Sequence, residues 1–118
     1  MDPRYQGYLD GLRARRAARD AEDSARTARA RALLPEAARI LREDFGATRV
    51  GAFGSLVTSG LAPESDIDLY VDALPRGSYW RAVARLATLF GRPVDLVELC
   101  DASPSLCATI AEDGVDVA

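Results

Sequence analysis

Two acidic residues, Asp66 and Asp68, stand one residue apart at the start of a strand-like run, residues 67–71. Because alternate side chains of a strand share a face, both carboxylates should point one way, while Ile67 and Leu69 are buried on the other side. Carboxylates within roughly 7 Å of each other repel, and a cation between them relieves that repulsion. Oxygen-only ligands suit Mg²⁺, which shares its coordination with substrate phosphates. The alternative is that one Asp begins the strand and the other is solvated.

A Gly-Ser pair, Gly54 and Ser55, follows another strand-like run, residues 49–53. A strand that ends in Gly-Ser and turns into a helix presents free backbone N–H groups, and these groups with the Ser55 hydroxyl suit phosphate oxygens. The alternative is an ordinary strand-to-helix connection, with glycine for backbone freedom and serine as the helix cap. Together, the turn and the acidic pair indicate a site for a nucleoside triphosphate and its metal more specifically than either does alone.

A third carboxylate, Asp95, interrupts the apolar strand-like run of residues 93–99. It falls on the face opposite Leu96 and Glu98. There it could help to bind a metal or accept the proton of an attacking hydroxyl. Glu98 competes with it as the functional acid, although a position near the strand end favours a solvated role.

Histidine is missing from the chain, and the two cysteines are Cys100 and Cys107. Schemes that depend on histidine are therefore excluded, as are most zinc sites, because two thiolates are too few ligands. The cysteines are best interpreted as small packing residues or surface thiols. Nothing resembles a signal peptide or a membrane span, so we expect a cytoplasmic, reduced protein that does not contact a membrane.

The length of 118 residues allows one small domain with a limited core and no separate substrate-binding domain. The net charge of −3 and the pI near 4.9 argue against generic nucleic-acid binding. The charge is unevenly distributed: residues 1–45 hold ten arginines and eight acids, whereas residues 46–118 hold five arginines and ten acids. The acidic part carries the candidate metal site.

Residues 1–34 are rich in Ala and Arg, which predicts one long helix. A helix of about 30 residues would reach about 45 Å. Since composition changes at Pro35, we divide the chain into this helix, for interaction or oligomerisation, and a domain of residues 35–118. Small residues recur along the helix at alternating spacings of four and three: Gly7, Gly11, Ala14, Ala18, Ala21, Ala25, Ala28 and Ala32. Such a seam would let another helix approach closely, as in a homo-oligomer. A solvated Ala-rich helix held by Arg–Asp pairs explains the pattern equally well.

Helical spacing and stop signals predict three further helices, at residues 36–45, 78–90 and 103–112. The first should bury Ala37, Ile40 and Leu41 and end at Gly46, the second should end at Gly91, and the third should begin at a Ser103 cap. A last short strand is expected at residues 115–117.

In this combination the chain resembles the minimal nucleotidyltransferases of the DNA polymerase β superfamily, over about residues 36–118. Their pattern is Gly-Ser, a short spacer, Asp-x-Asp and a later third Asp. The resemblance implies an α/β (α+β) nucleotidyltransferase fold with a small mixed β-sheet flanked by helices, here preceded by the long N-terminal helix. It also implies that Gly54 and Ser55 contact the triphosphate of ATP, that Asp66 and Asp68 ligate Mg²⁺, and that Asp95 joins them and activates the acceptor.

The spacer departs from the family in one respect. Where members often carry a basic residue followed by glycine, this chain has Thr58 and Ser59, with Gly60 one place later. Neutralisation of the triphosphate must then come from the metals or from an arginine elsewhere, such as Arg49, Arg76 or Arg81.

The family includes antitoxins that transfer AMP to all-helical HEPN toxins, and so small a chain would meet its acceptor on a partner. We therefore predict a Mg²⁺-dependent nucleotidyltransferase that moves AMP from ATP onto a hydroxyl of a protein or RNA partner, as the antitoxin of a HEPN-type toxin. The alternative is a nucleotidyltransferase-like protein with weak or lost catalysis that neutralises its partner by binding through the N-terminal helix. A standalone resistance enzyme is disfavoured, because the chain has little material for an acceptor pocket.

Overall fold

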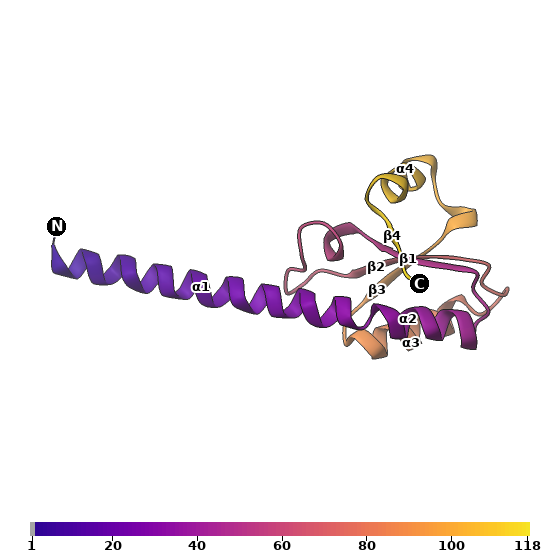
Figure 1. Ribbon diagram of the computed structural model, residues 1–118, viewed down its shortest axis with the longest axis horizontal. Coiled ribbons are helices and arrows are strands. Elements are labelled where there is room, and N and C mark those ends of the chain that lie inside the picture. The colour runs from indigo at the N-terminus through magenta and orange to yellow at the C-terminus, as the bar shows by residue number, and fades with distance from the viewer. Residues whose placement is uncertain (1) are drawn as a thin grey trace.

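A four-stranded mixed sheet with helices on both faces forms the body of the molecule in the computed structural model, which describes residues 2–118 (Figure 1). The strand order is β3-β2-β1-β4, and the strands are β1 Arg49–Phe53, β2 Ile67–Asp72, β3 Val94–Glu98 and β4 Val115–Asp116. Strand β1 runs antiparallel to β2 and β4, and β3 runs parallel to β2. The predicted α+β fold with a small mixed sheet is therefore confirmed.

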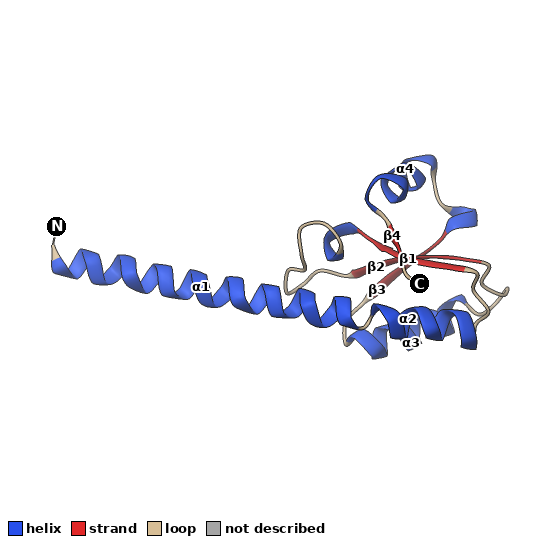
Figure 2. Cartoon of the chain, viewed as in Figure 1, coloured by secondary structure: helices blue, strands red, loops and turns tan. Residues whose placement is uncertain are grey.

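The helices lie close to the predicted positions (Figure 2). They are α1 Pro3–Ala32, α2 Leu34–Arg39, a π-helix Ile40–Asp44, α3 Tyr79–Phe90 and α4 Pro104–Asp113. Asp2 caps α1 by accepting the Arg4 N–H at 2.9 Å, and Ser103 caps α4 by accepting the Leu106 N–H at 3.2 Å. Met1, part of the predicted N-terminal helix, lies outside the described residues.

Pro35 lies at the start of a helix. It stands in the first turn of α2, which only Leu33 separates from α1. Ala37, Ile40 and Leu41 are buried, as expected. The one departure is that residues 40–44 form a π-helix instead of continuing α2.

The sheet separates two apolar clusters of unequal size. The larger cluster lies between the sheet and α2 and α3, and it includes Ile67, Leu69 and Val71 of β2. The smaller cluster consists of Phe53, Tyr70 and Ile110. Ile110 belongs to α4, which lies on the opposite face of the sheet (Figure 1). Since β2 alternates between these two environments, Asp68 must share the α4 face with Tyr70.

Helix α1 projects from the body, and this gives the molecule dimensions of 66 × 28 × 22 Å (Figure 1). Within α1 only Thr27 and Ala30 are buried, and residues 3–25 are exposed apart from half-buried Leu9 and Gly11. The small-residue seam therefore lies mostly in solvent, and its use as an interface stays a prediction. Within residues 2–118, no helix combines the length and the apolar character that crossing a membrane requires.

Candidate nucleotide and metal site

Asp68 and Asp95 are direct partners across the parallel pair β2 and β3. Neighbouring strands lie about 4.8 Å apart, so two side chains at one register position point from the same face and lie side by side. Asp68 is half-buried and Asp95 is exposed, while Asp66 lies exposed in the segment just before β2. The structure thus pairs two of the predicted carboxylates directly and places the third at the entry to the strand.

The Gly-Ser turn meets this acidic pair from the other side of β2. Phe53, the last residue of β1, is the partner of Asp68, so Gly54 follows immediately beside it. Gly54 has a φ of 71°, and a Cβ built there would overlap the Asp68 carboxylate and lie 3.2 Å from its Cγ. Glycine is therefore required where the Asp68 side chain packs directly against the backbone.

The prediction of a helix after Ser55 is wrong in detail, because the segment is a single 3₁₀ turn, Gly54–Leu56. The Thr58 hydroxyl donates to the Gly54 carbonyl at 2.9 Å, and the Gly60 N–H donates to the Ser55 carbonyl at 2.6 Å. These bonds turn the chain back after one turn of helix. The turn still carries both residues predicted to contact a triphosphate.

The pKa of Asp68 is raised to about 6, first by burial and then by the charges of Asp95 and Asp66. An ionised carboxylate is disfavoured in such surroundings, and a cation close to it would lower its pKa again. The charges of Asp66 and Asp95 therefore act on Asp68, and repulsion between carboxylates is the condition from which the sequence predicted a metal.

As they stand, no three acidic or cysteine side chains within residues 2–118 converge into a complete metal-binding group. Mg²⁺ does not need one, because it keeps several waters and is held by one or two carboxylates together with substrate phosphates. Asp68 and Asp95 offer only oxygen ligands, and Asp68, whose pKa is raised, lies beside the turn at Gly54. This arrangement fits Mg²⁺. Glu98, the competing acid, is half-buried at the far end of β3, where it pairs with Val71.

The three arginines proposed to neutralise a triphosphate lie away from the Gly-Ser turn. Arg49 is at the opposite end of β1, where it donates to Asp116 at 3.0 Å. Arg76 is exposed in the connection that follows β2, beyond the end of the strand opposite to the one that meets Gly54. Arg81 lies on α3 in a groove with Asp44 and Phe45.

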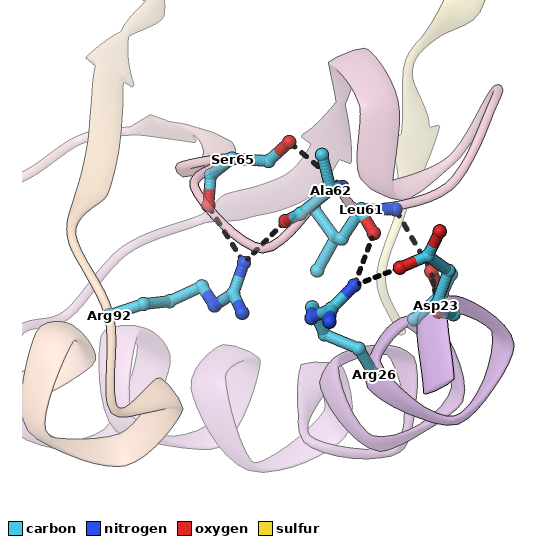
Figure 3. A network of polar contacts seen from close by, with 7 residues as sticks. Asp23, Arg26, Leu61, Ala62, Ser65 and Arg92 are labelled. Atoms are coloured by element: carbon cyan, nitrogen blue, oxygen red, sulfur yellow. Dashed lines mark hydrogen bonds and ion pairs between the residues drawn. The ribbon is translucent and has the colours of Figure 1, made fainter. Parts of the chain in front are cut away.

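Helix α1 and Arg92, which lies two residues after α3, hold the loop that leads to Asp66 (Figure 3). Buried Thr27 accepts the Leu61 N–H at 2.9 Å, and Arg26 donates to the Leu61 carbonyl at 3.2 Å. Arg92 donates to the carbonyls of Ala62 and Ser65 at 3.3 and 2.8 Å.

The sequence analysis did not predict these contacts of Arg26, Thr27 and Arg92 with the loop. One signal for them was available: Thr27 is the only β-branched residue in the first 34 positions.

The raised pKa of Asp68 predicts a pH-dependent loss of stability in the metal-free protein. Between the ordinary value of 3.8 and about 6, the folded state binds the extra proton, so the free energy of unfolding falls as the pH rises through this window. After discounting for exposure, the loss is about 1 kcal/mol. Urea unfolding of wild type and Asp68→Asn in EDTA at pH 4, 5 and 7 measures it, and an unchanged difference between the two proteins across these pH values would contradict the prediction.

Comparison with known proteins shows which family this chain matches and which solved structures are similar to it. Residues 36–118 match the family described as polymerase beta, nucleotidyltransferase. A chain of a toxin–antitoxin structure determined with AMP-PNP is 29% identical with a TM-score of 0.61, covering 70% of this chain and 70% of that one. A candidate minimal nucleotidyltransferase is 30% identical with a TM-score of 0.61, covering 77% of this chain and 93% of its own.

A further similar chain comes from the complex of a tri-AMPylated Shewanella oneidensis HEPN toxin with an MNT antitoxin. It is 28% identical with a TM-score of 0.54, and the match covers 69% of this chain and 65% of that chain. No curated protein sequence matches significantly. The family match begins at residue 36, so α1 lies outside it.

Proposed function

Because the chain belongs to the polymerase beta nucleotidyltransferase family, we propose that this nucleotidyltransferase moves AMP from ATP onto a hydroxyl of a partner molecule. The partner is a protein or RNA, and a HEPN-type toxin is the one that we favour. One observation carries the proposal: Gly54 packs its backbone against Asp68, and Asp95 stands beside Asp68 on the next strand.

In this mechanism the Gly54–Ser55 turn would hold the triphosphate, and Asp66 and Asp68 would hold Mg²⁺. When bound, Mg²⁺ neutralises charge on the phosphates and makes the phosphorus more electrophilic. The acceptor oxygen forms a bond to the α-phosphorus, the bond from that phosphorus to the bridging oxygen breaks, and pyrophosphate leaves. Asp95 takes the proton of the acceptor hydroxyl, and its exposure leaves room for a macromolecular acceptor.

The partner proposal draws on the structural relatives, which include a HEPN toxin in complex with an MNT antitoxin. We assign residues 35–118 to the transferase domain and residues 1–34 to partner binding or oligomerisation. Helix α1 carries eight arginines and four acids, a net charge of +4, and it exposes Tyr5, Tyr8 and Leu12. An acidic surface with apolar contacts on the partner would complement it.

Labelling with ATP tests the transfer. Purified protein is incubated with Mg²⁺ and lysate of the source organism, once with ATP labelled at the α-phosphate and once with ATP labelled at the γ-phosphate. Compared with lysate incubated alone, the purified protein should add label to a macromolecule from the α position only, since pyrophosphate leaves with the γ-phosphate.

Label from the γ position that appears only when the purified protein is added would instead indicate a kinase reaction and contradict the proposal. Absence of label from either position, with stable co-purification of a partner, would support the alternative of an antitoxin that acts by binding.

A further inference from the structure

Arg31 lies in the last turn of α1 and contacts the turn Gly54–Leu56. The proposed function assigns binding of the triphosphate to this second turn. Its Nε donates to the carbonyl of Leu56 at 2.7 Å. Leu56 ends the 3₁₀ turn that begins at Gly54. A residue 25 positions earlier in the chain, outside the range that matches the family, thus brings a guanidinium to the end of the turn that carries Gly54 and Ser55.

A groove of about 440 Å³ lies between α1 and the spacer. Arg31 lines it on the helix side, and Thr58 and Ser59 line it on the loop side. These two residues stand where related chains often carry a basic residue followed by glycine. Arg31 therefore places positive charge beside the positions from which the spacer's own basic residue is missing.

The Arg31 guanidinium has capacity to bind an anion. It takes part in no ion pair among residues 2–118, and the bond to Leu56 uses one of its five N–H donors. Asp23 also lines the groove, but its carboxylate is engaged by Arg26 at 2.6 Å. Arginine in this state is well suited to phosphate oxygens, which it can bind through two parallel hydrogen bonds.

We propose that Arg31 binds the triphosphate of ATP and replaces, from the N-terminal helix, the basic residue that the spacer lacks. This inference rests on the proposed function and adds a residue to its nucleotide site. It gives α1 two roles at the site, since Arg26 and Thr27 hold the loop while Arg31 supplies charge. The site would then be incomplete in residues 36–118 alone.

Two substitutions of similar length separate charge from packing. Arg31→Gln keeps a long side chain with N–H donors but removes the charge, and Arg31→Lys keeps the charge. Arg29→Gln is the matched control, because Arg29 lies on the same helix and lines a different groove with Leu33 and Phe90. The affinities of all four proteins for ATP and for AMP with Mg²⁺ are measured by calorimetry at constant salt, after thermal unfolding has confirmed folding.

Arg31→Gln should weaken ATP binding between roughly 10- and 100-fold, since it removes charge-assisted hydrogen bonds, and AMP binding by much less. Arg31→Lys should recover part of the ATP affinity, and Arg29→Gln should bind both nucleotides like wild type. Equal losses for ATP and AMP, or a Lys variant as weak as the Gln variant, would show a structural role and overturn the inference, as would unchanged ATP affinity in Arg31→Gln. Failure of the wild type to bind ATP would instead overturn the proposed function itself.

Discussion

Asp68→Asn should slow nucleotide transfer at least about a thousandfold while leaving the protein folded. The carboxamide has the shape of the carboxylate but not its charge, so the contact with Gly54 is kept while the proposed metal ligand is lost. Stability should not fall, because burial and the neighbouring acids raise the pKa of Asp68 to about 6 and thereby disfavour its charged form. Transfer rates at saturating Mg²⁺ and ATP, together with urea unfolding, test both parts.

Asp72→Asn is the control for this experiment. Asp72 lies on β2 with the same alternation as Asp68, but at the opposite end of the strand, where its partner is Arg49. It should retain transfer within a few fold of wild type. A wild-type rate in Asp68→Asn would show that Asp68 does not hold the metal, and an equal loss in both variants would point to a general effect of charge on the sheet.

Gly54→Ala should both destabilise the protein and lower transfer at least about a hundredfold. Two effects add: a φ of 71° is unfavourable for alanine by roughly 1–2 kcal/mol, and the new methyl group overlaps the Asp68 carboxylate. The carboxylate can give way only by leaving the position beside the turn. Urea unfolding and initial transfer rates measure the two losses.

Gly77→Ala separates the two effects. Gly77 has a similar φ of 83°, but a Cβ there would meet no atom within 4 Å. This variant should therefore lose about 1–2 kcal/mol of stability and keep its activity. If Gly54→Ala also kept its activity, the close approach of Asp68 to the turn would have no catalytic importance.

Alternation of side chains was sufficient to predict the sheet and the acidic pair. Ile67 and Leu69 are buried in the larger core, and Asp68 shares its face with Asp95, because a strand leaves each side chain only two faces to occupy. The face of each carboxylate could therefore be predicted from residues near it in the sequence. The direct pairing of Asp68 with Asp95 also needed the register of two strands, which the sequence alone did not determine.

The arginines could not be assigned in this way. Arg49 was a candidate for the nucleotide site by type, yet its place at the start of β1 pairs it with Asp116. Arg26 and Arg31 reach the loop because α1 crosses beside it, and the periodicity of a helix carries no information about the path of that helix through space. The connection after Ser55 closes into a single turn through hydrogen bonds within the loop itself, from Thr58 to Gly54 and from Gly60 to Ser55.

The contacts of α1 with the loop lie near the C-terminal end of the helix, so the length of α1 does not affect how it is attached to the domain. Whole turns could be added to or removed from the exposed end, residues 3–25, each changing the span by about 5.4 Å and leaving the loop contacts untouched. One residue inserted between Arg31 and Pro35 would instead rotate the entire helix by about 100° and carry Thr27 and Arg31 away from the loop together. Helix α1 is therefore free to change in length, whereas its rotation about its own axis relative to the domain is fixed.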